Sequence, residues 1–474
     1  MRIRGNWIFL AFSTVLATTA VAKVSPEEAA KLGIEGTELT PLGAIRAGNA
    51  DGSIPAWEGG IKQPPAGYVE GGWYVDPYAD DAILFTITGQ NYQQYADKLS
   101  PGQMAMLKKY PDYKLNVYPS RRSASFPQEI YENSIWNASN TEFCNPPRGP
   151  NREGRCVLRA VYRPGISFPI PKSGAEAMWN HTFYWFGKYY MQTVYGFNAF
   201  ADGNYAQFST RERWILPSSM NLDEIPKGDV YSRNGGAMWC FSQETLAPPR
   251  SAGTIFGGCN YFETTDFDAY IYIPGQRRVR KAPELGFYDS PSTNSDGSRT
   301  ADSRNMGAMT GDEEWYEWSA LQKEMFIPYN NYKLAQPGLT FDDIARVGHD
   351  NSDLIRYELH RVWAIEGKLK AGFRHLAPHR IVYVDEDSWA GAATDMYDAR
   401  GDLWRVSEAF LINYYNVPMV NWWGDDHADL ISGRHAANGG WSNVGGNVSD
   451  IINFHTMPDP AINTPAGLRK FGTR

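Results

Sequence analysis

Carboxylates and histidines are the side chains of this sequence that could hold a metal ion, and they are densest near its C-terminal end. Residues 424–429 are Gly-Asp-Asp-His-Ala-Asp. Two or three carboxylates and an imidazole could ligate a cation there, with His435 or His455 as further ligands. A solvated acidic turn explains the same pattern more simply. We therefore predict neither a metal site nor a cofactor.

A second acidic run, Asp-Glu-Asp at 385–387, follows an expected strand. Paired carboxylates suit acid–base catalysis, but an exposed strand end or turn is the interpretation that we favour. His360, His375 and His379 lie on or near two neighbouring expected strands. Their spacing does not show whether they converge.

The motifs of the large enzyme classes are missing from the sequence. It has no Gly-x-Ser-x-Gly elbow, no phosphate-binding glycine loop and no His-Glu-x-x-His. We therefore predict a protein that is not an enzyme and has no catalytic residues. The alternative is a hydrolase of the cell envelope acting on an apolar or polymeric substrate. It requires His360, His379 or His427 to meet carboxylates in one pocket.

The four cysteines form two sequence-local pairs, Cys144 with Cys156 and Cys240 with Cys259. Four cysteines permit three connectivities, and we predict the local one, which closes two short loops. A zinc site is the alternative. The sequence lacks any Cys-x-x-Cys spacing, and an oxidising compartment favours disulfides.

Export is predicted by residues 1–22. Arg2 and Arg4 give a positive start, residues 7–17 are almost wholly apolar, and Ala-Val-Ala at 20–22 has the small-x-small pattern of a cleavage site. The apolar run is shorter than the roughly 20 residues that a transmembrane helix needs. We expect a signal peptide and a soluble periplasmic product, one that could associate with the outer membrane.

Charge argues against a nucleic-acid partner, because 45 Lys and Arg face 53 Asp and Glu, a net charge of −8. The one basic run is Gln-Arg-Arg-Val-Arg-Lys at 276–281. We predict that Arg277, Arg278 and Arg280 contact a lipid headgroup or an acidic partner protein. A solvated strand end, neutralised by nearby carboxylates, is the alternative.

Strands dominate the later part of the chain. They are expected over 189–197, 205–216, 266–273, 357–366, 380–385 and 403–412. Within 266–273 and 357–366 one alternating set of side chains is mostly apolar, which indicates an antiparallel sheet with one apolar face. Asp-Ala-Arg-Gly at 398–401 predicts a hairpin turn.

Helices are expected earlier, after the capping signals at Ser25 and Ser100 and over residues 89–99. Residues 39–72 are rich in Gly and Pro and should wrap the surface. We divide the chain into a signal peptide (1–22), helices with a wrapping arm (23–156) and a sheet region (157–474), the last two forming one structural unit. The fold class is mainly β (α+β), and no strand–helix rhythm suggests a Rossmann or TIM architecture.

The aromatic content, 14% of all residues, is the unusual feature of the composition. A long sheet with aromatic side chains on one concave face is a natural cavity for an apolar ligand. The alternative is that these rings are ordinary core, as most single Trp and Phe residues are.

Several motifs together resemble a known family. Leu-Gly-Ala-Ile-Arg-Ala-Gly-Asn at 42–49 is followed by Ile-Pro-Ala-Trp-Glu-Gly-Gly at 54–60. Further motifs stand at 168–181, 272–280, 326–330, 360–363, 383–389 and 397–405. Their order is similar to that of the exported domain of unknown function 1329 family of Gram-negative bacteria, whose members are labelled outer-membrane lipoprotein-sorting-like.

The resemblance implies a fold similar to periplasmic lipoprotein carriers: a large antiparallel, incomplete β-barrel closed by helices. It also implies partners, namely transporters of the resistance–nodulation–division type and outer-membrane proteins, and it supplies no catalytic residues. We therefore predict a non-enzymatic periplasmic carrier or adaptor that binds a hydrophobic molecule or lipid. Trp363, Tyr383 and Trp404 lie on motif strands and are the predicted lining residues. A structural accessory of an outer-membrane protein is a further alternative.

Overall fold

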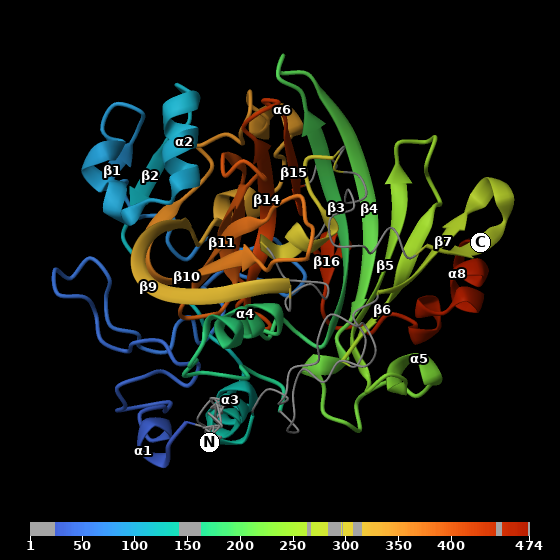
Figure 1. The fold of residues 1–474 in the computed structure, drawn as a ribbon, viewed down its shortest axis with the longest axis horizontal. Helices are drawn as coiled ribbons and strands as arrows, with labels where there is room; N and C mark the ends of the chain where they lie inside the picture. The colour runs from blue at the N-terminus through green and yellow to red at the C-terminus, as the bar shows by residue number, and fades with distance from the viewer. Residues whose placement is uncertain are drawn as a thin grey trace, which may run out of the picture.

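One large, strongly curved sheet organises the protein (Figure 1). The computed structural model describes residues 24–141, 163–262, 267–282, 295, 297–306, 315–441 and 448–472. Sixteen strands of this part of the chain form the sheet. They are β1 (Phe85–Ile87), β2 (Leu115–Tyr118), β3 (Tyr189–Ala199), β4 (Tyr205–Ile215), β5 (Ala237–Ala247), β6 (Ile255–Tyr261), β7 (Asp268–Ile273), β8 (Arg278–Lys281), β9 (Tyr316–Pro328), β10 (Tyr357–Leu369), β11 (His379–Asp385), β12 (Gly391–Tyr397), β13 (Leu403–Asn413), β14 (Val420–Asp429), β15 (His435–Gly439) and β16 (Ile452–Asn453).

The sheet is open. Its strand order is β1-β2-β10-β11-β12-β13-β14-β15-β3-β4-β5-β6-β7-β8, with β9 pairing β10 and β16 pairing β3. Among the described ladders, β2 and β10 are parallel and the others are antiparallel. No described pairing joins β1 to β8, so the sheet does not close into a barrel. The predicted fold class is confirmed: mainly β, with one large, mostly antiparallel sheet and few helices.

Short helices surround the sheet. The α-helices are α1 (Pro26–Ala29), α2 (Pro101–Lys109), α3 (Gln128–Asn140), α4 (Gly174–Thr182), α5 (Asp229–Ser232), α6 (Phe341–Ile344), α7 (Val448–Ile451) and α8 (Pro465–Gly472). The 3₁₀ turns are η1 (Tyr92–Lys98), η2 (Pro217–Ser219), η3 (Pro274–Gln276), η5 (Ala301–Met306), η7 (Tyr332–Ala335) and η8 (Pro460–Asn463). No helix in the described ranges is long and apolar enough to cross a membrane.

The capping signals form the helices that they predict. Ser100 Oγ accepts from the Gln103 N–H at 3.0 Å, and Gln103 Oε1 accepts from the Ser100 N–H at 3.1 Å, so two backbone donors are satisfied at the start of α2. Ser25 caps α1 in the same way. The helix expected over 89–99 is shorter and is the 3₁₀ turn η1, whose N-cap has no side-chain hydrogen bond.

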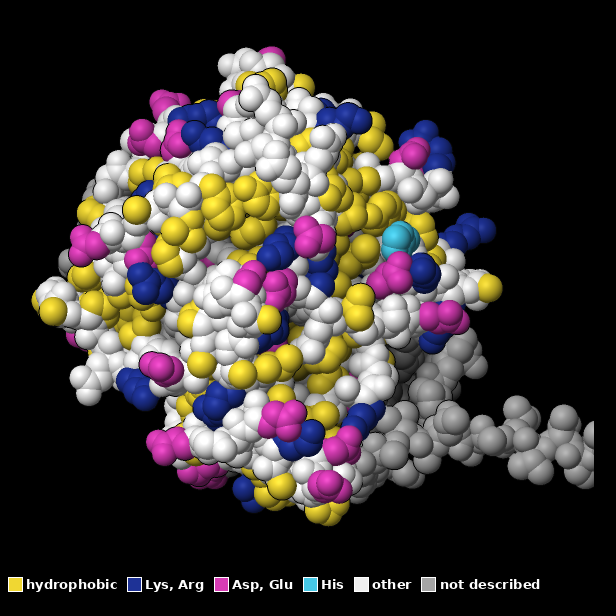
Figure 2. Space-filling model, turned by 90° about the vertical axis from the view of Figure 1, so that its left-hand side faces the viewer, with side chains coloured by type: hydrophobic (Ala, Val, Ile, Leu, Met, Phe, Trp, Pro, Cys, Tyr) yellow, Lys and Arg dark blue, Asp and Glu magenta, His cyan; other side chains and the backbone are white. Residues whose placement is uncertain are grey.

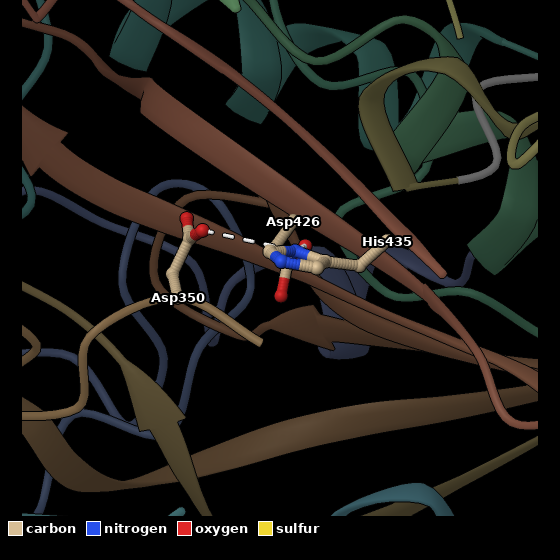
Figure 3. Close-up of side chains that lie close together, drawn as sticks. All are labelled: Asp350, Asp426 and His435. Carbon is tan, nitrogen blue, oxygen red and sulfur yellow. Dashed lines mark hydrogen bonds and ion pairs between the residues drawn. The ribbon is translucent and has the colours of Figure 1, made fainter. Parts of the chain in front are cut away.

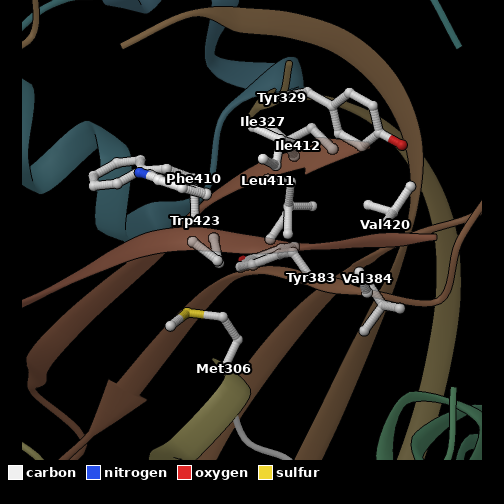
Figure 4. Packing of buried hydrophobic residues seen from close by; sticks show 14 of the residues in the cluster. Met306, Ile327, Tyr329, Tyr383, Val384, Phe410, Leu411, Ile412, Val420 and Trp423 are labelled. Atoms are coloured by element: carbon white, nitrogen blue, oxygen red, sulfur yellow. The ribbon is translucent and has the colours of Figure 1, made fainter. Parts of the chain in front are cut away.

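The strand predictions hold with shifts of a few residues at their ends. Residues 398–401 turn between β12 and β13, with Gly401 at φ +86°. The expectation of a single apolar face is wrong for the middle of the sheet. From Arg405 onward every residue of β13 is buried, so both of its faces are covered. α2 packs against β12 and β13, α4 packs against β9 and β10, and the core among them is dense (Figure 4).

The signal peptide, Cys144 and Cys156 lie outside the described residues. Figure 2 shows the face on the β1–β9 side of the molecule, where hydrophobic side chains gather in patches. Lys and Arg alternate there with Asp and Glu, so this face presents no continuous basic surface.

Candidate functional site

A row of aromatic side chains crosses the sheet from β3 to β6. Tyr190 is opposite Trp214, and Trp214 is opposite Phe241 in the strand register. Because directly opposite residues of antiparallel strands project to the same face, these rings lie side by side. We call the full set the aromatic file: Tyr190, Trp214, Trp239, Phe241, Phe256 and Phe267.

The rings of the aromatic file are in direct contact. Centroid separations are 5.9 Å for Tyr190–Trp214, 4.8 Å for Trp214–Phe241 and 5.6 Å for Phe241–Phe267. Trp239 lies 5.1 Å from Phe267 and is only half-buried. Such separations are those of favourable aromatic pairs. The file is therefore a continuous apolar strip, and Trp239 is its most accessible member.

The opposite face of the same strands has its own packing. Cys240 alternates with Trp239 and Phe241 and forms a disulfide with Cys259 on β6, which confirms the predicted pairing. These cysteines cluster with Tyr231 of α5. α8 covers Tyr272 of β7 farther along. With one face filled by short helices, the aromatic file faces the main core.

The three predicted lining residues have separate surroundings. Trp363 stacks on Trp389 at 5.8 Å, whereas Tyr383 is buried and its hydroxyl donates to Asp395 at 3.2 Å. Trp404 Nε1 donates to Asp429 at 2.9 Å. No described contact joins any two of the three. Their role as lining residues stays a prediction.

Arg277, Arg278 and Arg280 are exposed at the end of the sheet. Arg277 ends the turn η3 in the left-handed region at φ 51°, and the other two lie on β8. Lys281 pairs with Asp268 at 3.4 Å. The exposure that contact with a headgroup or partner requires is present.

The acidic run at 385–387 is buried, so the predicted exposed strand end is wrong. Asp385 accepts from His360 Nδ1 at 2.9 Å, and Asp387 accepts two hydrogen bonds from Arg122, at 2.7 and 2.9 Å. Burying a carboxylate costs free energy because its hydration is lost. Here hydrogen bonds from cationic donors compensate for that loss. The run follows β11 into the interior because Arg122 and His360 meet it there.

His360 is held between two acids. Its Nε2 lies 3.3 Å from Glu358, opposite the contact with Asp385. Burial opposes the charge of the ring, yet hydrogen bonds to Asp385 and Glu358 raise the pKa of His360 to about 10. The imidazolium thus uses both nitrogens as donors to the two carboxylates.

The second acidic run, 424–429, is also buried, because Asp425, Asp426, His427 and Asp429 lie on β14 in the interior. The favoured interpretation of a solvated acidic turn is therefore wrong. The run is buried because β14 pairs with β13 on one side and with β15 on the other, which makes it a central strand. Polar side chains on such a strand need buried partners.

The histidines do not share one pocket. His360 pairs with Asp385, His379 pairs with Glu366 at 2.9 Å, and His427 lies 3.5 Å from Asp425. His375 lies 3.0 Å from Asp302. His360 meets two carboxylates, Glu358 and Asp385, which is the contact that the hydrolase alternative requires, but all three residues are buried.

Comparison with known proteins places the chain in a family. The family model for a protein of unknown function, DUF1329, matches residues 86–458. An uncharacterized protein of Pseudomonas aeruginosa is 39% identical over 467 residues, covering 97% of each chain. The chain belongs to the DUF1329 family.

Solved structures with some likeness to this DUF1329 member include a DUF1329 family protein from Desulfovibrio piger, with a TM-score of 0.41 and 12% identity over 62% of this chain and 97% of that one. A LolA superfamily protein from Nitrosomonas europaea has a TM-score of 0.35 and 11% identity over 62% of this chain and 98% of that one. The family assignment rests on the sequence matches.

The aromatic file of this DUF1329 protein was not predicted from its sequence. The strands β3, β4 and β7 were expected, but β5 and β6, which carry Trp239, Phe241 and Phe256, were not. A usable signal was present in the cysteines: pairing Cys240 with Cys259 sets the register of β5 and β6, and hence puts Phe241 opposite Gly258. The remaining registers depend on tertiary packing.

Proposed function

We propose that this DUF1329 protein is a non-enzymatic periplasmic carrier or adaptor that binds a hydrophobic molecule or lipid against the aromatic file. The observation behind the proposal is the continuous strip of contacting rings with the half-buried Trp239 in it. The sheet is open, and Trp239 is the member of the strip that is not fully covered.

The physical driving force is apolar burial. Each Å² of apolar surface removed from water contributes roughly 25 cal/mol, and much of that surface would be the ligand's own, because every ring of the file except Trp239 is already buried. Flat rings also accept acyl chains and ring systems alike. We infer a cargo class defined by apolar surface rather than by one polar group.

Periplasmic location and partners complete the proposal. The signal-peptide pattern at 1–22 supports export, and the resemblance of the sequence motifs supports work alongside a resistance–nodulation–division transporter or an outer-membrane protein. The exposed arginines at 277, 278 and 280 are proposed to meet an anionic headgroup or an acidic partner surface.

The first experiment is native mass spectrometry of the mature protein taken from periplasmic extract, with organic extraction of any bound molecule. N-phenyl-1-naphthylamine then serves as the apolar fluorescent probe for Trp239→Ala, with Trp363→Ala as the matched half-buried tryptophan control. We expect Trp239→Ala to weaken probe binding at least about tenfold, since loss of one ring removes over 1.4 kcal/mol of contact.

Each outcome decides a different point. Weakened probe binding by Trp239→Ala together with unchanged binding by Trp363→Ala supports the aromatic file as the site. Weakened binding by Trp363→Ala or Trp404→Ala, with Trp239→Ala unaffected, moves the site to the originally predicted lining residues. A wild-type protein that carries no apolar molecule and takes up no probe contradicts the carrier function altogether.

A further inference from the structure

Three side chains from two parts of the fold converge beneath α6. Asp426 lies on β14, His435 begins β15, and Asp350 follows α6 in the loop that bridges back to Ala345 (Figure 3). One ligand atom from each lies within 4.8 Å of the others, and all three residues are buried. The His435 Nδ1 atom is 2.8 Å from Asp426 Oδ1 and 3.9 Å from Asp350 Oδ1.

Asp350 is the anomaly of this group. Both of its carboxylate oxygens are buried, and neither accepts a hydrogen bond. A buried carboxylate without donors is costly, and native proteins rarely keep one without a counter-charge or a ligand. The side chain points toward His435 and Asp426, as Figure 3 shows.

The hydrogen bond on the far side of His435 fixes the tautomer. Its Nε2 lies 2.9 Å from the Arg346 carbonyl oxygen, which can only accept, so Nε2 carries the proton. At 2.8 Å from Asp426 Oδ1, Nδ1 shares a proton with that carboxylate, and a bound cation would replace this proton. Metal-bound histidines use this same arrangement, one nitrogen donating to a carbonyl while the other ligates.

Neighbouring acids have the cationic partners that Asp350 and Asp426 lack. Asp387 has Arg122, and Asp425 has Arg299 at 3.8 Å together with the Asn438 amide at 2.7 Å. The Arg346 guanidinium near Asp350 donates to the carbonyls of Asp342 and Ala345 instead. Among the described residues, Asp350 and Asp426 thus have His435 as their one shared ion-pair partner, which leaves the group short of positive charge.

We propose that Asp350, Asp426 and His435 bind a divalent first-row transition-metal cation, such as Zn²⁺ or Mn²⁺. Two carboxylate oxygens and one imidazole nitrogen are a ligand set that such cations accept, and a 2+ charge neutralises two carboxylates. The ion ties the loop after α6 to β14 and β15. Because the ligands are buried, the ion enters as the protein folds and stabilises the folded state.

The surroundings strengthen this assignment. The rings of Phe197 and His435 are 5.5 Å apart, so the site has an apolar wall. The Tyr110 hydroxyl, also buried without a hydrogen-bond partner, lies close to Gly348 of the same loop.

The test uses the mature protein with its Cys240–Cys259 disulfide intact, unfolded in guanidinium chloride and refolded with Zn²⁺, Mn²⁺ or EDTA. Bound metal is measured by inductively coupled plasma mass spectrometry after dialysis, and stability by the thermal midpoint. We expect one tightly held ion per wild-type chain and a higher midpoint after refolding with metal. Asp350→Asn should hold one ion fewer and bind at least 100-fold more weakly.

The stability of Asp350→Asn without metal shows whether the variant folds. Since Asp350 accepts no hydrogen bond, removing its charge should leave the EDTA-refolded protein as stable as wild type or more so. His379→Gln is the control, because His379 and Glu366 form a half-exposed pair able to take up metal at the surface. Equal metal content in wild type and Asp350→Asn would overturn the proposal, as would wild type that binds neither ion.

Discussion

At the scale of single residues, the interior of this protein contains paired charges. His360, Glu358 and Asp385 are all buried, and the imidazolium joins the two carboxylates. The Tyr329 ring packs 4.3 Å from the imidazole, and the Ser388 hydroxyl donates to Asp385 at 2.6 Å. Every polar atom here has a partner that would be left unpaired by a single substitution.

Replacing His360 by Gln should therefore destabilise the protein in a pH-dependent way. The pKa of His360 is raised to about 10 from 6.5, so its stabilising charge is fully present below pH 6.5 and is lost as pH rises through about 10. We expect a loss of about 3 kcal/mol in the free energy of unfolding at pH 6, narrowing toward pH 10. Urea unfolding of wild type and variant at pH 6, 8 and 10 measures the difference.

His379→Gln is the control for this experiment, because His379 and Glu366 are half-exposed and such a pair contributes under about 1 kcal/mol. A stability difference for His360→Gln that does not change between pH 6 and pH 10 would mean that the ring is neutral in the folded protein.

The sequence revealed which polar residues cluster but not where they lie. Asp-Glu-Asp at 385–387 and the acidic run at 424–429 stood out, and both were assigned to solvent, because acidic runs usually are. Their burial depends on Arg122, which is more than 200 positions away in the chain, and on His435 across a strand pair. Local sequence carries no trace of such partners.

At the scale of elements, the Gly/Pro-rich arm is held by specific contacts. The Arg122 guanidinium donates to the carbonyl of Ile45 at 2.9 Å, and Trp389 Nε1 donates to that of Leu42 at 2.9 Å. Gly43 turns the chain between these points at φ +94°, where a Cβ would lie 1.7 Å from the Pro169 carbonyl oxygen. The arm has no helix or strand, and these contacts fix its path over the surface.

Gly43→Ala should consequently loosen the arm. The left-handed backbone costs an L-residue about 1 kcal/mol, and the collision with Pro169 adds to it, so we expect a loss of at least about 2 kcal/mol. Gly52→Ala is the matched control, since it has φ +77° and nothing within 4 Å of its Cβ. Urea unfolding compares the two, and equal losses would contradict the docking of Gly43 against Pro169.

Elements were predicted best where the signal is local. The capping boxes at Ser25 and Ser100, the turn at 398–401 and the Cys240–Cys259 bridge all depend on residues close in sequence, and all are present. The second covered face of the sheet was not predicted. Alternation of apolar and polar residues along a strand indicates one buried face, whereas both faces of β13 are buried, by elements distant in the chain.

At the scale of the whole molecule, an open sheet must protect its ends. β8 is the last strand of the path, and no described strand pairs with its outer edge. Free edge N–H and C=O groups invite pairing with another chain, and charged side chains on the edge strand discourage it. Arg278 and Arg280 are exposed on β8, which gives the basic run a structural use beside the proposed headgroup contact.

The double variant Arg278→Thr/Arg280→Thr should therefore self-associate, because threonine favours strands and removes the repulsion between two copies of the edge. Sedimentation velocity at increasing concentration should show a larger share of associated species than wild type.

Arg374→Thr/Arg400→Thr removes the same charge from exposed positions outside β8 and should sediment like wild type. Vesicles containing anionic phosphatidylglycerol, added to both variants, separate the two uses of the run. Lost vesicle binding without self-association would assign the arginines to headgroup contact, and self-association with unchanged vesicle binding would assign them to edge protection.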